Sequence, residues 1–149
     1  MKKEKDLYQV SLKILLKNDK GEILALKAVE GGSYSGFYEL PGGRIDTDEF
    51  KVDFGNIISR EVKEEIGEVK FNLKNKPIAV ARHLVPANMT SNGEARRVLQ
   101  LFFEAEYLGG EIEISNEHTG YKWLDLNKIK IEEFFTAGIL EGIKMYMNS

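Results

Sequence analysis

One short stretch of the chain combines a helical hydrophobic pattern with a row of glutamates. Ile58, Val62 and Ile66 recur every fourth residue, which predicts an amphipathic helix. Asp53 is placed to cap the start of this helix, and Gly67 is placed to end it. Residues three and four apart share one face of a helix, so the acidic side chains gather on one edge. These side chains are Glu61, Glu64, Glu65 and Glu68.

The glutamates work against the stability of the predicted helix. Like charges at this spacing repel by roughly a few tenths of a kcal/mol per pair. The helix dipole also disfavours anions in the last turn, by roughly 0.3–1 kcal/mol each. Two interpretations account for the cluster, and the spacing alone leaves both open. It is either a solvated acidic surface balanced by Arg60 and Lys63, or a site for a hard divalent cation such as Mg²⁺.

A glycine pair comes shortly before the acidic helix. Leu40-Pro41-Gly42-Gly43 predicts a sharp turn whose backbone carbonyl and N–H groups are not covered by side chains. Glycine allows a backbone to approach phosphate or metal closely, so the pair is a plausible cradle. Taken alone, the motif indicates only a turn.

Together these residues resemble the signature of the Nudix hydrolase family. That signature has Gly, five free positions, Glu, seven free positions and then Arg-Glu-apolar-x-Glu-Glu-x-Gly-apolar. Gly43 and Glu49 match its opening, and residues 60–67 (REVKEEIG) match its close. The chain departs from the pattern twice. Ten residues, 50–59, separate the two halves where the family has seven, and Glu68 occupies the final apolar position.

The longer spacer affects the first half of the signature more than the second. Three extra residues make nearly one helical turn, so they extend the loop or the helix start without rotating the carboxylates. They leave open whether Glu49 contacts Arg60, as its family counterpart does.

The resemblance implies a fold and an activity. The expected fold is α/β, the α/β/α sandwich of the Nudix family with a mixed β-sheet, formed by residues 1–149 as a single domain. The expected activity is a Mg²⁺-dependent pyrophosphohydrolase, with Mn²⁺ as an alternative metal, cleaving the diphosphate linkage of a nucleoside diphosphate derivative. Hydrolysis of a nucleoside triphosphate to monophosphate and pyrophosphate is the first choice. Enzymes for nucleotide sugars or dinucleoside polyphosphates, and a catalytically silent nucleotide-binding sensor domain, are the alternatives.

The resemblance also implies roles for individual residues. Carboxylates and the Gly42 carbonyl would hold the metal, with Arg60 orienting the carboxylates. Glu117 resembles a later-loop glutamate that is followed by histidine and tryptophan in many Nudix sequences, and the general base is left open between it and a glutamate of the signature. The predicted metal ligands are Gly42, Glu61, Glu64, Glu65 and Glu117, and the predicted catalytic residues are Glu61, Glu64, Arg60 and Glu117.

Substrate contacts are expected from the residues around the glycine pair and from loop aromatics. Gly43 and Arg44 are placed to contact phosphate, as is Arg82, with Arg96 and Arg97 as further candidates if they face the cleft. Aromatic rings in the loop before the glycine pair either stack on a nucleobase or pack against the core. These rings are Tyr34, Phe37 and Tyr38.

The rest of the chain alternates between strand patterns and turns. Strands are predicted over 7–16, 22–29, 37–40, 78–85, 96–107 and 121–124, the first with one buried side. Residues 71–77 look like a polar connection, 112–114 like a brief strand, and 30–36 and 86–94 like loops. Helical spacing of apolar residues predicts a second helix over 131–147. Gly138 and Gly142 lie on its apolar stripe, which indicates close packing against a sheet.

Composition narrows the classes of protein to which this chain can belong. The chain has 149 residues, which suits one domain, and a net charge of −3, which does not suggest a nucleic-acid surface. It has no cysteine for disulfide or thiol chemistry, and its 2 histidines lack the spacing of a zinc site. Residues 1–6 are charged without an apolar segment behind them, and no apolar run suits a membrane span. We therefore expect a cytoplasmic protein that binds a small-molecule nucleotide, with no nucleic-acid or membrane partner and with a homodimer left open.

Overall fold

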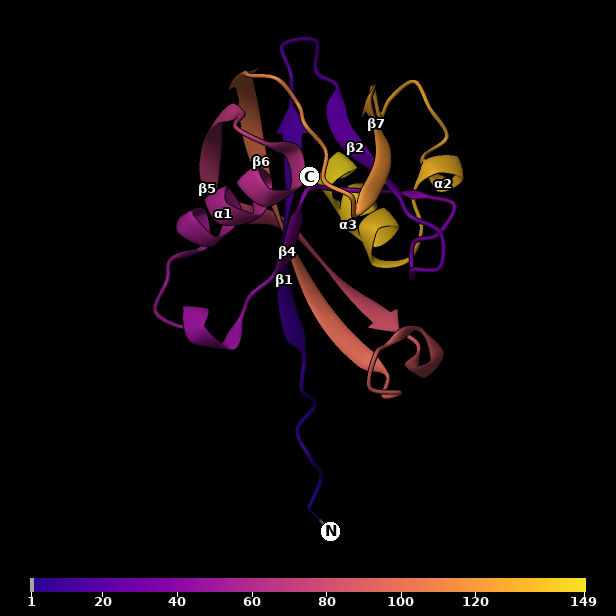
Figure 1. The fold of residues 1–149 in the computed structure, drawn as a ribbon. Helices are drawn as coiled ribbons and strands as arrows, with labels where there is room; N and C mark the ends of the chain where they lie inside the picture. Colours follow the sequence, from indigo (N-terminus) through magenta and orange to yellow (C-terminus); the bar gives the residue numbers. More distant parts are fainter. Residues whose placement is uncertain (1) are drawn as a thin grey trace.

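Helices α1 and α3 lie on opposite faces of a seven-stranded mixed sheet in the computed structural model, which describes residues 2–149 (Figure 1). The α/β/α sandwich expected from the sequence is therefore present. The strands are β1 (Gln9–Lys17), β2 (Ile23–Ala28), β3 (Tyr38–Glu39), β4 (Gly42–Arg44), β5 (Lys70–Val85), β6 (Arg96–Gly109) and β7 (His118–Leu124). The helices are α1 (Phe54–Ile66), α2 (Ile131–Phe134) and α3 (Ala137–Met147), with 3₁₀ turns at Thr47–Glu49 and Ala87–Met89.

The sheet divides beside its central strand β1. Its main order is β3-β2-β1-β6-β5, with β1 and β6 parallel and the other pairs antiparallel. β1 meets β2 at Lys17↔Ile23, but nearer its start it pairs with β4 instead, from Ser11↔Arg44 to Lys13↔Gly42. β2 pairs along its length with β7. The two halves of the sheet therefore part on one side of β1.

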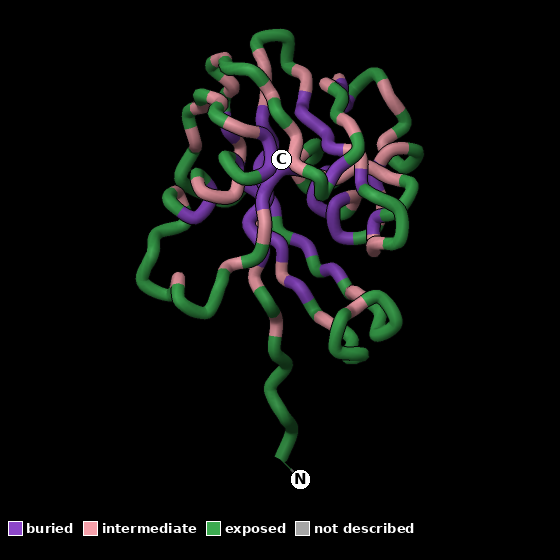
Figure 2. Tube along the Cα trace, in the orientation of Figure 1, coloured by how far each residue is buried: buried purple, intermediate pink, exposed green. Residues whose placement is uncertain are grey.

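Each face of the sheet has its own apolar core. α1 packs against the face that carries Leu12, Ile14 and Leu16, whereas α3 packs against the face that carries Leu15 and Phe102. All five side chains are fully buried, and burying a side chain of this size contributes roughly 1.5–3 kcal/mol. Figure 2 shows the buried residues concentrated along the inner strands and the inward faces of these helices. β1 is thus covered on both sides, where the sequence predicted one buried side.

The ends of α1 follow the predicted signals. The Asp53 carboxylate accepts a hydrogen bond from the Asn56 N–H at 3.3 Å and so satisfies one free donor of the first turn. At the other end Gly67 has φ +89°, a conformation that disfavours side chains, and its N–H donates to the Lys63 carbonyl. Both ends are as the sequence predicted.

The prediction of a polar connection at residues 71–77 is wrong. These residues belong to β5, which pairs with β6 from Lys70↔Gly109 onward. Phe71 and Leu73 pack against the α1-side core, while polar side chains of this edge strand face solvent. The register shifts on either side of Pro77, which has no N–H to donate to the ladder.

The predicted helix over 131–147 is interrupted. α2 ends at Phe134, Phe135 and Thr136 are extended, and α3 starts at Ala137 with φ +51°. The break lets Phe135 be fully buried in the α3-side core. The apolar spacing continues across the break, so a local pattern does not reveal it.

The brief strand predicted at 112–114 is also absent from the described structure, where residues 110–117 form no strand. Backbone groups of this segment bond to the end of α1 instead. The Glu113 N–H donates to the Ile66 carbonyl at 2.9 Å, and the Ser115 N–H donates to the Glu65 carbonyl at 3.0 Å. These bonds satisfy carbonyls that the last turn of a helix leaves free.

Candidate active site

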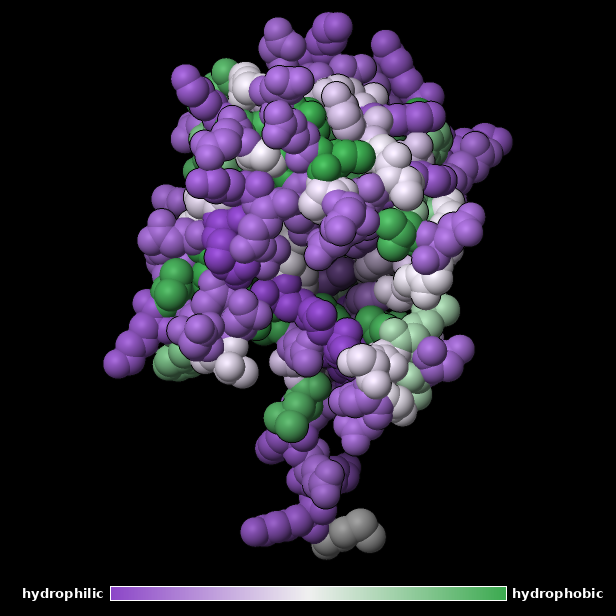
Figure 3. All heavy atoms as spheres, in the orientation of Figure 1, coloured by the Kyte–Doolittle hydropathy of each residue, from purple (hydrophilic) through white to green (hydrophobic). Residues whose placement is uncertain are grey.

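A cavity of about 590 Å³ lies where the two halves of the sheet part, a volume typical of small-molecule sites. The space-filling view shows a hollow in this face of the molecule, bordered mainly by hydrophilic residues (Figure 3). One side of the cavity is formed by the last turns of α1, and the opposite end by β5, β6 and the loop before β3. The cavity therefore joins the acidic edge of α1, formed by Glu61, Glu64 and Glu65, to the sheet face on which α3 packs.

The acidic edge combines a buried carboxylate with more accessible ones. Glu61, Glu64 and Glu65 all line the cavity, but Glu65 is only 6% exposed and its Oε2 atom has no hydrogen-bond partner. Burial raises the pKa of Glu65 to about 7, although the nearby positive charge of Lys13 opposes this rise. Burial also raises the pKa of Glu61. Glu64 is more exposed, with 59% of its side chain accessible.

Arg60 holds this edge together despite the longer spacer. Its Nη2 and Nε atoms donate to the two oxygens of Glu49, at 2.7 and 3.0 Å. Its Nη1 atom lies 3.1 Å from Glu61 Oε1 and 3.3 Å from Glu64 Oε2. Glu49 also accepts from the Asp46 N–H, and the hydrogen bonds from Asp46 and Arg60 hold the pKa of Glu49 below its usual range. The three extra residues therefore leave the Glu49–Arg60 contact intact.

The glycine pair lies in strand β4 rather than in the predicted turn. Gly42 has φ +131°, and a Cβ atom there would overlap the Leu12 carbonyl of the neighbouring strand. A Cβ atom on Gly43 would overlap the carboxylate of Glu61. Glycine at both positions therefore lets β1 and the Glu61 carboxylate approach the β4 backbone directly.

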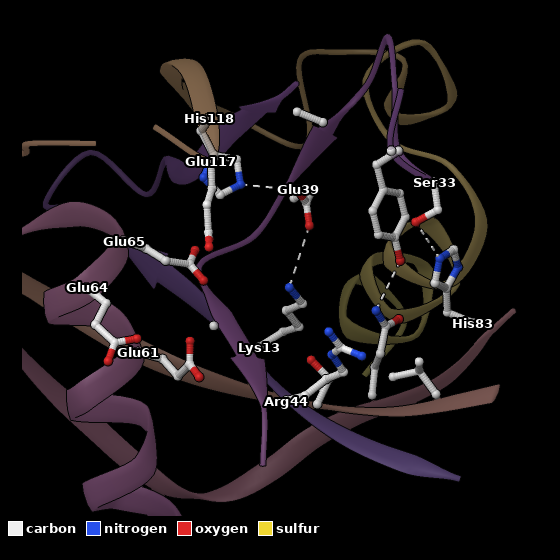
Figure 4. A pocket seen from close by; sticks show the side chains of 18 of the residues that line it. Lys13, Ser33, Glu39, Arg44, Glu61, Glu64, Glu65, His83, Glu117 and His118 are labelled. Atoms are coloured by element: carbon white, nitrogen blue, oxygen red, sulfur yellow. Dashed lines mark hydrogen bonds and ion pairs between the residues drawn. The ribbon is translucent and has the colours of Figure 1, made fainter. Parts of the chain in front are cut away.

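Glu117 reaches the same cavity from a loop far along the chain. The bonds from Glu113 and Ser115 to the end of α1 fix this loop beside Glu65. The Glu117 side chain points into the cavity toward the acidic edge (Figure 4). The structure thus brings together every predicted metal ligand: Gly42, Glu61, Glu64, Glu65 and Glu117 line one cavity.

Three further polar side chains in the cavity were not identified from the sequence. Lys13, on β1, lies 3.7 Å from Glu39 Oε1, and His118 Nε2 lies 3.1 Å from Glu39 Oε2. Burial alone would lower the pKa of His118, but the hydrogen bond and charge of Glu39 raise it. Burial would raise the pKa of Glu39, but the His118 hydrogen bond and the Lys13 charge lower it. The signals in the sequence were a lysine within the apolar run of residues 12–16, the glutamate before Leu40-Pro41-Gly42-Gly43 and the histidine after Glu117.

The end of the cavity away from α1 is lined by aromatic rings and by an amide side chain. Tyr34 stacks on His83, with ring centroids 4.5 Å apart and planes 16° apart, and its hydroxyl accepts a hydrogen bond from Gln100 Nε2 at 3.0 Å. His83 Nε2 lies 3.1 Å from Ser33 Oγ. Burial lowers the pKa of His83, so its imidazole stays neutral at neutral pH. Tyr34 therefore packs within the protein while also lining the cavity.

The remaining predicted substrate residues divide between the cavity and other surfaces. Gly43, Arg44 and the further candidate Arg96 line the cavity. Phe37 and Arg82 are not among its lining residues, and Arg82 is exposed where its neighbours Ala81 and His83 are buried, so it faces the other side of β5. Side chains alternate along a strand, which explains this placement. The candidate Arg97 also lies outside the cavity, 3.5 Å from Asp6.

The side chains of the acidic edge are of the kind that binds a hard divalent cation. Within residues 2–149, no three carboxylate or imidazole side chains are already gathered as ligands around one point. The edge nevertheless provides carboxylate oxygens, including the unpartnered Oε2 of Glu65, beside a backbone without side chains at Gly42 and Gly43. Mg²⁺ and Mn²⁺ prefer oxygen ligands of this kind.

Comparison with known proteins settles the family. The family model described as the NUDIX domain matches residues 7–141. This chain belongs to the Nudix family. The resemblance seen in the sequence is thereby confirmed, and the chain is a Nudix hydrolase, an enzyme that acts on acid anhydride bonds of phosphorus-containing compounds. A search of curated proteins finds no match to the chain.

Solved structures confirm the Nudix fold. A MutT protein from Methanosarcina mazei Go1 superposes with a TM-score of 0.75 at 25% identity, covering 98% of this chain and 97% of the other. The MutT NUDIX hydrolase from Burkholderia pseudomallei gives 0.68 at 20% identity, covering 97% and 100%. An ADP-ribose pyrophosphatase from Streptococcus suis 89-1591 gives 0.63 at 19% identity, covering 95% and 91%. Among the described residues, no helix has the length and apolar character needed to cross a membrane.

Proposed function

We propose that this Nudix hydrolase is a Mg²⁺-dependent pyrophosphohydrolase that cleaves a nucleoside triphosphate to the monophosphate and pyrophosphate. The observation that supports this most directly is the composition of the cavity beside α1. Its α1 edge carries Glu61, Glu64 and Glu65, while Arg44 and Arg96 line it elsewhere. A polyanionic phosphate chain requires positive charge, and the acidic edge offers it only through a bound cation.

The metal would be held by the acidic edge and the adjacent backbone. Glu61, Glu65 and the Gly42 carbonyl are the proposed direct ligands, and Glu64 and Glu117 complete the set directly or through water. When bound, Mg²⁺ neutralises developing charge on phosphoryl oxygens and lowers the pKa of an attacking water. Arg60 keeps the carboxylates in place through its bonds to Glu49, Glu61 and Glu64.

A carboxylate must also accept the proton of the attacking water. Glu64 and Glu117 are the exposed carboxylates of the proposed set, so both can exchange a proton with solvent after each turnover. Glu64→Gln and Glu117→Gln, each assayed across Mg²⁺ concentrations, separate the two. The variant that loses the base loses turnover even at saturating Mg²⁺, while the other changes mainly the metal dependence.

The substrate class is tested with a panel of nucleotides. Canonical and oxidised nucleoside triphosphates, nucleotide sugars and dinucleoside polyphosphates are incubated with Mg²⁺, with Mn²⁺ or with a chelator, and the products are separated. Metal-dependent release of pyrophosphate from a triphosphate is the expected result. Turnover of a nucleotide sugar or a dinucleoside polyphosphate in its place would reassign the substrate. Binding without turnover would identify a nucleotide sensor.

The role of the buried carboxylate is tested by Glu65→Gln. We expect hydrolysis to fall at least about 100-fold, because the amide cannot replace a charged ligand. Glu68→Gln is the matched control, since Glu68 lies just beyond α1, pairs with Lys63 and has 81% of its side chain exposed. Full activity in the Glu65 variant would refute the assignment, provided that its far-ultraviolet spectrum matches the wild type.

A further inference from the structure

Lys13 occupies an unusual place for a charged side chain. Among residues 2–149 it is the one lysine or arginine that is buried, with 7% of its surface exposed. It projects from β1 on the same face as Leu15, which is fully buried. Burying an ammonium group is costly unless it is well paired. The position of Lys13 therefore calls for an anionic partner.

The protein supplies that partner only in part. The nearest carboxylate atom is Glu39 Oε1 at 3.7 Å, which exceeds the distance of a direct charge-assisted hydrogen bond. The other oxygen of Glu39 pairs with His118. An ammonium group has three donors, and within residues 2–149 the long contact with Glu39 is the one side-chain partner found for the Lys13 ammonium. Two of its donors therefore remain available to a ligand in the cavity.

The register of the sheet places Lys13 beside the acidic edge. Lys13 pairs with Gly42 across β1 and β4, and Arg44 pairs with Ser11 two residues away on the same face. Residues in such a diagonal arrangement come within reach of one another's long side chains. In Figure 4 the Lys13 side chain rises in the middle of the cavity, between the glutamates of α1 and the end formed by Ser33 and His83.

The charge of Lys13 acts on both ends of the cavity. Its positive charge lowers the pKa of the imidazole of His83 and opposes the rise in the pKa of the Glu65 carboxyl. A substrate that extends from the acidic edge to the Tyr34 end must pass this ammonium group, because Lys13 lines the cavity between them.

We propose that Lys13 binds the phosphate chain of the substrate, leaving its long pair with Glu39 to donate hydrogen bonds to non-bridging phosphate oxygens. This inference rests on the proposed function and adds a substrate-binding residue outside the family signature. It also favours substrates with consecutive phosphate groups, because Lys13 and Arg44 offer two cations side by side. Lys13 is then a phosphate ligand and not a ligand of the metal.

The test compares Lys13→Met and Lys13→Arg with the control Lys17→Met. Lys17 lies on the same strand and face, but it pairs with Glu104 at 3.9 Å and has 42% of its side chain exposed. Steady-state kinetics with the best triphosphate of the panel are combined with calorimetric titration of inorganic pyrophosphate at fixed Mg²⁺. A titration with Mg²⁺ alone reports whether the metal site is intact.

Removing the charge of Lys13 is expected to weaken phosphate binding and to leave Mg²⁺ binding nearly unchanged. For Lys13→Met we expect KM to rise, and pyrophosphate affinity to fall, by about tenfold or more, the loss of one charge-assisted hydrogen bond. The turnover number and Mg²⁺ affinity should stay within about threefold of the wild type. Lys13→Arg should recover part of the affinity, and Lys17→Met should change neither quantity.

Unchanged KM and unchanged pyrophosphate affinity in Lys13→Met would overturn the inference. Should this variant fail to fold, Lys13→Gln carries the same test with a polar, uncharged side chain. Wild-type protein that hydrolyses no nucleotide would refute the proposed function, whereas the pyrophosphate titration would still decide the role of Lys13. The two failures are therefore distinguishable.

Discussion

Glu65 connects the cost of the acidic edge in folding stability to its proposed use in binding a metal ion. It is buried, one of its oxygens has no hydrogen-bond partner, and burial raises its pKa to about 7. A carboxylate in this state costs stability once it is charged and uncompensated. A cation bound at the edge would remove that cost, so the same residue links stability to metal binding.

The contribution of Glu65 to the stability of the metal-free protein should fall as pH rises from about 4.5 to about 7. In this range folded Glu65 holds a proton that its unfolded form has lost, so unfolding becomes easier as pH rises. The loss is complete above the folded pKa and amounts to about 3 kcal/mol at most. Urea denaturation in chelator at several pH values checks this. Glu65→Gln lacks this component, and an identical pH dependence in both proteins would contradict the expectation.

The Glu49–Arg60 contact should matter to catalysis without touching the substrate. We expect Glu49→Gln to lower kcat/KM by about tenfold or more, because Arg60 loses the partner that fixes it beside Glu61 and Glu64. Asp48→Asn is the control, since it removes a charge from an exposed neighbour. Equal kinetics in the two variants would show that Arg60 needs no such support.

At the scale of elements, α3 approaches the sheet through its glycines. Gly138 lies over His83 and Gln100, and Gly142 lies over the ring of Phe102, close enough that a Cβ atom would overlap these groups. The predicted close packing is therefore confirmed. Through Gly138, this contact also fixes the side chains at the far end of the cavity.

Gly142→Ala should destabilise the protein by up to about 2 kcal/mol. Alanine gains about 1 kcal/mol in helix propensity, but overpacking typically costs about 1–3 kcal/mol. The packing cost prevails because the added Cβ atom would overlap the ring of Phe102, which is fully buried in the α3-side core. Urea denaturation beside the exposed control Glu141→Ala measures the difference. A stabilised Gly142 variant would mean that α3 shifts easily on the sheet.

The family signature made α1 and its acidic edge predictable, because spacing, cap and stop all lie within one short segment. Lys13 was missed for the opposite reason. Its neighbours Glu39, Glu65 and His118 come from β3, α1 and β7, and a local alternation pattern cannot report this. His83 and Gln100 come together through the register of β5 and β6, and Tyr34 reaches them from the loop before β3. The break at Phe135 was hidden because the apolar spacing continues through it.

At the scale of the whole molecule, the cavity depends on several separate parts of the chain. Its walls come from β1, the loop before β3, α1, β5, β6 and the segment before β7. A cation at the acidic edge would draw its ligands from α1, β4 and the segment before β7, which come together only in the folded chain. Ligands that bind only the folded state stabilise it.

Adding Mg²⁺ to metal-free protein should raise the melting temperature by several degrees. Saturation at about 100 times the dissociation constant contributes about 2.7 kcal/mol, and each kcal/mol shifts Tm by about 2–4 °C in a protein of this size. Thermal scans with increasing Mg²⁺ measure the shift. Glu65→Gln should reduce it and Glu68→Gln should keep it, whereas a flat wild-type response would argue against a cation at this edge.

The parallel pairing of β1 with β6 has a consequence for how the protein is made. The two strands begin at Gln9 and Arg96, so the ribosome releases the first long before it completes the second. A nascent chain that has just produced α1 holds the whole family signature but lacks a neighbouring strand on which its central strand depends. The apolar residues of β1 stay without their final cover until then, and such distant pairings form slowly. The candidate active site therefore forms only after β6 has been synthesised, in a step that joins β1 to a strand far along the chain.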